Sequence, residues 1–248
     1  LTVQKLIDDL RLSRKFLLVG VLALVMLAVP LGLVLSTGLA SLSRSATALS
    51  GVAPAVAVAQ EVQLMQQHRG QAANVLSGNE AARAPREALQ ARSIEAMQAQ
   101  LSAAQAYGNA PIEQRVRKMQ ADWAQLTQAV GQRSIDTAES FRRHSALIDE
   151  QLDILRALVD SAGLALLPQP SGHYLVVAAL DYLPRLSEAL GQARAAGVAL
   201  LNGGQADPAG QARVGALVNA ARLYDRHAQG ALALAMADSA VAQQALAA

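Results

Sequence analysis

The sequence predicts an all-α protein in which one transmembrane helix is followed by a long antiparallel helical bundle. Strong helix formers such as alanine, leucine, glutamine, arginine and glutamate dominate the chain. Aromatic residues make up only 3 %, and the Val/Ile/Thr/Tyr alternation that is typical of strands is almost absent. In addition, the 28 residues from Phe16 to Ser43 include no charged side chain, and glycines and prolines divide the remaining sequence into segments of helical length.

The uncharged run predicts the membrane-spanning helix. A bilayer core about 30 Å thick is crossed by about 20 apolar residues in a helix. The run from Phe16 to Ser43 exceeds that length, which leaves room for tilt. The alternative is a cleaved signal peptide with Ala55–Val56–Ala57 as its cleavage site, but the apolar region of a signal peptide has only about 7–15 residues.

Basic residues on either side of the run predict its orientation. Four precede it and one follows it closely: Lys5, Arg11, Arg14 and Lys15, and then Arg44. Short segments rich in lysine and arginine remain in the cytoplasm. We therefore expect a cytoplasmic stub at residues 1–15, the membrane helix at 16–43 and an extracytoplasmic domain at 44–248. In a bacterium this arrangement means a single anchor in the inner membrane and a main domain in the periplasm.

Charge and composition exclude several classes of protein. Residues 44–248 carry 17 basic and 17 acidic side chains, so the basic excess of the chain lies in the stub, and no basic face typical of nucleic-acid binding is evident. With no cysteine, the outer domain depends on core burial rather than on disulfides. The four histidines lack metal-ligand spacing, and catalytic motifs are absent from the sequence. We expect no metal, no cofactor and no enzymatic activity in this chain.

Glycine and proline residues predict where the helices end. We expect helices that end at Leu76 and that cover residues 80–106, 112–166, 173–201 and 208 onwards, with Asp207 capping the last one. Pro54 and Pro184 lie inside helices and predict kinks. A helix over 112–166 would be roughly 80 Å long unless Gly131 or Gly163 interrupts it. That length predicts two bundles stacked end to end.

Two segments, Gln67–Gly78 and Gln192–Gly203, align without gaps. Arg69 and Arg194 each lie nine residues before the glycine that ends the segment. An arginine that faces the interior of a bundle needs a partner for its charge, and its forked donors suit a planar anion. The alternative is that these arginines are solvated or form ion pairs with Glu61 or Glu188.

Three other features allow a structural or a functional interpretation. Trp123, the only tryptophan, is expected to pack in the core. Tyr174 and Tyr182 are expected either to line a pocket or to belong to the core. The cluster Arg142–Arg143–His144 is interpreted as a solvated helix face.

Two patches resemble the helical sensory domains of bacterial transmembrane receptors, including the nitrate- and nitrite-sensing type and related double-bundle types. The first patch is Gln66–Gly70 together with Leu76–Gly78, and the second comprises Tyr174–Leu175, Leu183–Glu188, Leu190–Arg194 and Gly197. The chain departs from the pattern in the loop Leu167–Pro170, which lacks acidic residues, and at Arg194–Ala195, where arginine is usually followed by glycine. The order and spacing agree over roughly residues 14–205.

The resemblance implies a ligand site formed by arginines from helices of the bundle. Arg69 matches the first patch, and Arg194 is added through the repeat and the second patch. His68 and Tyr174 complete the predicted ligand-binding set.

The resemblance also implies a function. We expect the sensing part of a membrane receptor of the methyl-accepting chemotaxis type, which works as a homodimer in the lipid bilayer and binds a small, anionic ligand. The alternatives are the sensor of a membrane histidine kinase or diguanylate cyclase, and a helical scaffold without a ligand. Receptors of this kind continue to an output domain, which can be enzymatic, so we expect the chain to be a fragment.

Overall fold

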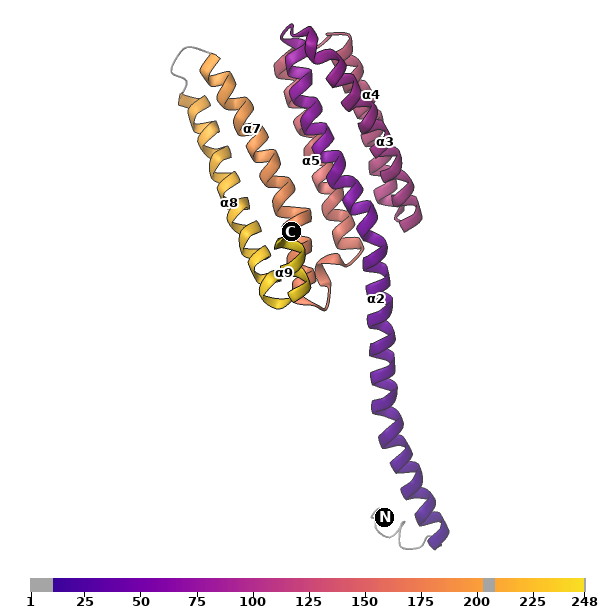
Figure 1. Ribbon diagram of the computed structural model, residues 1–248. Coiled ribbons are helices and arrows are strands. Elements are labelled where there is room, and N and C mark those ends of the chain that lie inside the picture. The colour runs from indigo at the N-terminus through magenta and orange to yellow at the C-terminus, as the bar shows by residue number, and fades with distance from the viewer. Residues whose placement is uncertain (1–10, 203–207, 248) are drawn as a thin grey trace. The chain divides into compact units, whose positions relative to one another are not determined.

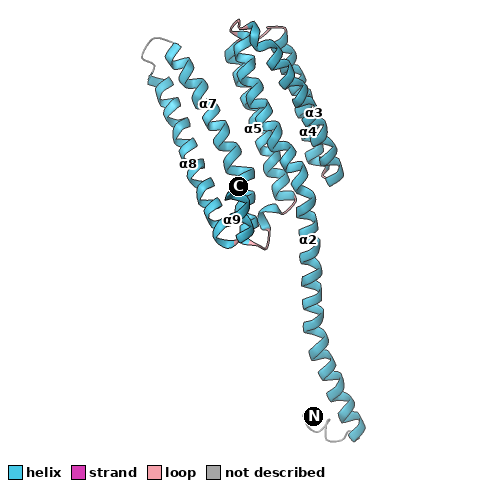
Figure 2. Ribbon diagram, in the orientation of Figure 1, coloured by secondary structure: helices cyan, strands magenta, loops and turns pink. Residues whose placement is uncertain are grey.

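All regular elements in the described part of the chain are helices (Figures 1 and 2). The computed structural model describes residues 11–202 and 208–247. These residues confirm the all-α prediction. The chain divides into two units, with the boundary between Ala46 and Thr47.

The first unit contains the beginning of helix α2, which runs from Leu12 to Leu76 and continues into the second unit. The side chains of its apolar segment are exposed, including Phe16, Leu24 and Val34. By length and composition, α2 is long and apolar enough to cross a membrane. The boundaries predicted for the stub, the membrane helix and the outer domain stay predictions.

The second unit contains the end of α2 and the ten helical elements that follow it in the chain (Figure 1). They are η1 (Glu80–Ala82), α3 (Arg83–Tyr107), α4 (Ala110–Gly131), α5 (Thr137–Ser161), η2 (Leu164–Leu166), α6 (Pro170–Val177), η3 (Ala178–Tyr182), α7 (Leu183–Asn202), α8 (Pro208–Asp238) and α9 (Ala240–Ala247). Helices α3 and α4 pack on each other, α4 packs on α5, and α7 packs along α8.

Local sequence accounts for the predicted helix ends. Gly78 and Gly108 adopt left-handed backbone conformations, with φ values of 93° and 78°, just after α2 and α3. Glycine has no Cβ and takes this conformation without steric cost. The Asn109 side chain then accepts a hydrogen bond from the backbone N–H of Ile112, at 3.2 Å, and caps α4. The ends predicted near Leu76 and Ala106 are therefore confirmed within one residue.

The single helix expected over 112–166 is replaced by α4 and α5. A turn after Gly131 separates them, in which Arg133 has a φ of 53°, and Asp136 caps α5 by accepting a hydrogen bond from the Glu139 N–H at 2.7 Å. The interruption at Gly131, one of the two alternatives, is the one found, and Gly163 follows α5 rather than breaking it. The length mismatch that predicted stacked bundles therefore does not exist.

The helix expected over 173–201 consists of α6, a π-helical turn and α7. The π turn η3 lies directly before Pro184. Proline has no N–H, so the carbonyl of Leu180 lacks its α-helical partner, and the ladder is locally rearranged. Pro54, in contrast, lies inside α2 without ending it. The predicted cap Asp207 lies outside the described residues, and the last helix, expected without a stop, breaks at Ser239 between α8 and α9.

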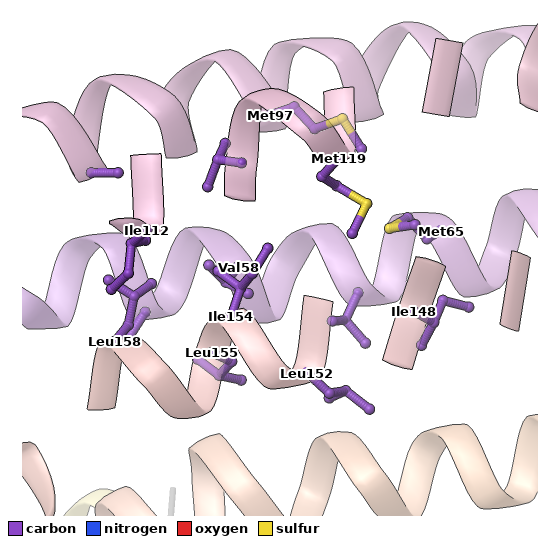
Figure 3. Packing of buried hydrophobic residues seen from close by; sticks show 14 of the residues in the cluster. Val58, Met65, Met97, Ile112, Met119, Ile148, Leu152, Ile154, Leu155 and Leu158 are labelled. Atoms are coloured by element: carbon purple, nitrogen blue, oxygen red, sulfur yellow. The ribbon is translucent and has the colours of Figure 1, made fainter. Parts of the chain in front are cut away.

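The main core lies between α2, α3, α4 and α5. Figure 3 shows side chains from these four helices gathered in the interior. Met65 of α2, Met97 of α3 and Met119 of α4 are each at most 2 % exposed. Flexible methionines fill irregular gaps between helices. Trp123 is 1 % exposed, which confirms its expected core position.

We predict that Gly51→Ala destabilises the second unit. A methyl group at this position would overlap the Cβ of Ala162. Overpacking of this kind costs about 1–3 kcal/mol. Gly230→Ala in α8 is the matched control, because a Cβ there meets no atom within 4 Å. It should raise the free energy of unfolding by about 0.4–1 kcal/mol. Thermal and denaturant unfolding followed by circular dichroism measures both, and equal stabilities would contradict the prediction.

Candidate functional site

A buried ion pair joins α2 to α7. The Arg69 guanidinium donates from Nη1 to Glu188 Oε1 at 2.6 Å and from Nη2 to Glu188 Oε2 at 3.1 Å. Both side chains are only 6 % exposed. A two-pronged contact of this kind matches the planar donors of arginine to the two oxygens of a carboxylate. The ion-pair alternative for Arg69 is therefore found, with Glu188 as the partner.

Further contacts fix both members of the pair. Arg69 Nη1 also donates to the Ser145 hydroxyl at 2.8 Å, and the guanidinium carbon lies 4.9 Å from the centre of the Phe141 ring. A Cβ at Gly191 would lie 2.9 Å from Arg69 Nη2, so the absence of a side chain at Gly191 leaves space for the guanidinium. The ion pair is thus enclosed by α2, α5 and α7.

The Glu188 carboxylate accepts two amide hydrogen bonds as well. Gln66 Nε2 of α2 donates to Glu188 Oε2 at 3.1 Å, and Gln192 Nε2 of α7 donates to Glu188 Oε1 at 2.7 Å. Ser187 in turn donates its hydroxyl hydrogen to Gln66 Oε1 at 2.8 Å. Four side-chain hydrogen bonds therefore cross between α2 and α7 around this one carboxylate.

His68, the neighbour of Arg69, points into the core of the bundle. Its Nδ1 lies 2.9 Å from Nε2 of His144, whose Nδ1 lies 2.7 Å from the Ser140 carbonyl oxygen. The carbonyl can only accept, so His144 carries its proton on Nδ1, and His68 donates from Nδ1 to His144. His68 Nε2 is then an unprotonated, buried nitrogen without a hydrogen-bond partner.

Both histidines are held neutral. Burial lowers the pKa of each one well below its usual range, and for His68 the positive charge of Arg86 adds to this effect. The Trp123 ring packs edge-on against both imidazoles, with ring centres 4.8 Å and 5.8 Å away. The interpretation of His144 as part of a solvated face was wrong, because its side chain faces the core of the bundle while Arg142 is exposed.

Glu61 is a second unusual titratable group in the core. Its side chain is fully buried, and neither carboxylate oxygen has a hydrogen-bond partner. Burial raises the pKa of Glu61 to about 8, and the nearby Ser93 offsets only part of this effect. Glu61 is therefore protonated and uncharged at neutral pH.

Two of the predicted ligand residues lie apart from Arg69. Arg194 is exposed on α7, and Tyr174 is half-buried on α6, where it stacks edge-on with His173. No described contact joins either residue to Arg69. Tyr182, the other tyrosine considered for a pocket, packs against His227. The structure thus brings together Arg69 and Glu188, places His68 beside them on the core side, and leaves the other two residues elsewhere.

Comparison with known proteins identifies the family. The family model described as "Nitrate and nitrite sensing" matches residues 62–248, which is more than half of the chain. The chain belongs to the nitrate- and nitrite-sensing family. The predicted resemblance to helical sensory domains of this type is confirmed, and the domain is a sensing module of signalling proteins. No curated protein and no solved structure matches the chain.

A nitrate- or nitrite-sensing domain needs a site with positive charge or hydrogen-bond donors for an anion, and a groove on the bundle differs from the surroundings of Arg69 in charge. A groove of about 560 Å³ between α3 and α4 is lined by Met97, Leu101, Trp123 and other uncharged residues, several of them glutamines. It offers an anion no charge of opposite sign. The Arg69 guanidinium is the better candidate, because it is positive, buried and already engaged with a carboxylate.

Sequence reasoning missed several residues around Arg69. Ser145 and Phe141 of α5 lie one helical turn apart and form the wall behind the guanidinium. Their sequence gives no polar motif, so only the packing of α5 on α2 reveals them. Gln66 and Gln192 lie within the two patches that resemble helical sensory domains. Their positions in these patches could have indicated that they belong to the site.

We predict that Arg69→Ala strongly destabilises the sensing domain. The change leaves the Glu188 carboxylate buried without its cation, and breaking a buried pair from one side costs about 3–5 kcal/mol. Arg115→Ala is the matched control, since its pair with Glu150 is part-exposed, and it should change stability little. Thermal unfolding of the full chain in detergent tests this prediction, and equal losses in both variants would contradict it.

We also predict that stability falls as the pH rises from 6.5 to 8. The folded state keeps a proton on Glu61 that the unfolded chain has already released, because the folded pKa of about 8 lies above the unfolded value of 4.5. Glu61 contributes at most about 1.4 kcal/mol per pH unit to this fall. The buried histidines act in the opposite direction, because the unfolded chain binds protons that the folded state rejects, and their effect becomes small as the pH rises above the unfolded histidine pKa of 6.5.

Glu61→Gln isolates this effect, because glutamine keeps the shape and cannot ionise. The variant should lose clearly less stability than the wild type over the same pH range. Chemical unfolding at pH 6.5, 7.2 and 8 provides the measurement. A variant with the same slope as the wild type would show that Glu61 does not carry the pH dependence.

Proposed function

We propose that this chain is the extracytoplasmic ligand-sensing part of a bacterial membrane receptor of the methyl-accepting chemotaxis type. It binds nitrate, nitrite or a similarly small planar anion at Arg69 and passes a helix movement to the membrane. The observation that carries this proposal is the buried Arg69 guanidinium, which holds two carboxylate oxygens in a domain of the nitrate- and nitrite-sensing family.

The chemistry of Arg69 supports a planar oxyanion as the ligand. Nitrate and nitrite each present two coplanar oxygens, as a carboxylate does, and the guanidinium matches them with parallel N–H groups. Inside a bundle the attraction is less screened than in water. The Ser145 hydroxyl, 2.8 Å from Arg69 Nη1, is one further group that a small anion at this position would meet.

The path of α2 supports the proposed relay. The helix is continuous from the apolar segment to Leu76, and Arg69 lies near its end. A ligand that favours one packing of α2 against α7 shifts the population towards that packing. Helix shifts of about 1–2 Å are typical of such transitions. The second unit would transmit the movement along α2.

The remaining parts of the proposal concern the setting. The basic residues before the apolar segment support a cytoplasmic start, an inner-membrane anchor and a periplasmic sensor. The resemblance to chemotaxis receptors supports a homodimer and a chain that acts by binding rather than by catalysis. The same resemblance covers the sensors of histidine kinases and diguanylate cyclases, which are the alternative types of output.

We predict that the full chain, reconstituted in lipid nanodiscs, binds one nitrate ion at each Arg69 site. Arg69→Lys should weaken binding about tenfold or more, since lysine retains the charge but loses the paired donors. Arg115→Lys is the control with an unchanged affinity. Isothermal titration calorimetry measures all three, with circular dichroism to verify folding. Absence of nitrate and nitrite binding, or binding that Arg69→Lys leaves unchanged, would reject the site.

A further inference from the structure

Glu188 holds the position on Arg69 that an anionic ligand needs. Its two oxygens lie 2.6 Å and 3.1 Å from the two terminal nitrogens of the guanidinium, and the pair is almost fully buried. The same Nη1 also donates to Ser145. An anion cannot form the paired contact with these two nitrogens while the carboxylate occupies them.

We infer that Glu188 is an internal stand-in for the ligand, which a planar, singly charged oxyanion displaces, so that binding releases α7 from α2. This inference rests on the proposed function of Arg69 and adds how the site is regulated. Carboxylate, nitrate and nitrite share one negative charge and two coplanar oxygens. Exchange of one for the other therefore keeps the guanidinium paired, which a buried cation requires.

The hydrogen bonds around Glu188 determine what the exchange breaks. The contacts of Glu188 with Arg69 and Gln66 cross from α7 to α2, whereas its contact with Gln192 stays within α7. Among the described side chains, displacement of the carboxylate therefore removes three of the four hydrogen bonds that cross between the two helices and leaves the bond between Ser187 and Gln66.

The irregular backbone at the start of α7 could act as a hinge for this movement. The π turn η3 and Pro184 interrupt the regular α-helical ladder between α6 and α7. Irregular turns of this type are often found at functional sites and absorb small changes in helix direction. Because α7 packs along α8, the two would move together as a hairpin.

Calorimetry of the full chain in nanodiscs tests the stand-in role with Glu188→Gln. The glutamine amide presents N–H groups to the guanidinium, so it competes poorly for Arg69, and the nitrate affinity should rise about tenfold or more. Glu150→Gln is the matched control, since it removes the same charge from a part-exposed pair and should leave the affinity unchanged. Chloride, which lacks paired oxygens, should bind neither variant tightly. If Glu188→Gln proves unstable, Glu188→Asp, whose carboxylate is one carbon shorter, should give a smaller increase.

A distance measurement tests the release of α7. The chain has no cysteine, so the pair Gln67→Cys and Leu190→Cys places spin labels only on exposed positions of α2 and α7. Pulsed electron resonance should show a longer distance with nitrate than without it. Glu188→Gln added to this pair should show part of the increase without nitrate.

The outcomes separate the inference from the proposed function. If the wild type binds nitrate through Arg69 but Glu188→Gln binds with equal or lower affinity, the stand-in role is wrong and the site remains. If nitrate binds and the distance is unchanged, the release of α7 is wrong. If neither the wild type nor Glu188→Gln binds nitrate or nitrite, the proposed function fails and the inference fails with it.

Discussion

The requirement that a buried cation has a partner determines the arrangement around Arg69. A guanidinium with 6 % exposure loses most of its hydration, so an opposite charge must lie within hydrogen-bond distance. Its own helix does not provide one, and the partner is Glu188 on α7. This need for a partner accounts for three features around Arg69: the position of α7, the space left by Gly191, and the hydroxyl of Ser145.

Three other titratable groups in the bundle interior avoid charge in a different way. Glu61 keeps its proton, and His68 and His144 remain neutral, because burial penalises the charged form of each group. The two imidazoles pack against Trp123, and neither Glu61 nor the histidines form an ion pair among the described residues. These three polar side chains can therefore lie in the core uncharged, at the cost of a stability that depends on pH.

The sequence was sufficient for the fold class and for most helix ends, because these depend on local chemistry. Glycine after α2 and α3 and asparagine before α4 act within a few residues of the ends they determine. The turn between α4 and α5 was less visible, since Arg133 rather than a glycine takes the left-handed conformation there. The π turn before Pro184 was also missed, because a proline alone predicts a kink without its geometry.

The candidate site was predictable only in part. The sequence indicates how far along a helix a residue lies more readily than which neighbouring helix its side chain faces. The repeat placed Arg69 and Arg194 at equal distances from their helix ends, yet Arg69 is buried and Arg194 is exposed. Rotation about the helix axis is determined by packing with other helices. For His144, in contrast, the sequence contained the information on burial. Its spacing from Ile148 and Leu155 places all three side chains on one face of α5, and that face is buried.

A sensor gains from an occupied site, because it needs two states of similar free energy. A bundle with an unpaired buried Arg69 would be costly, and a ligand would then be required for folding rather than for signalling. With Glu188 in place, the domain would be stable without its ligand, and the apparent affinity for the ligand would be lowered because only the small fraction of molecules with a released Glu188 could bind it. The response would come from the ligand's preference for the released state, since a ligand changes the population of two states only by its preference for one of them. The strength of the contact between Glu188 and Arg69 would therefore set the concentration at which the domain responds.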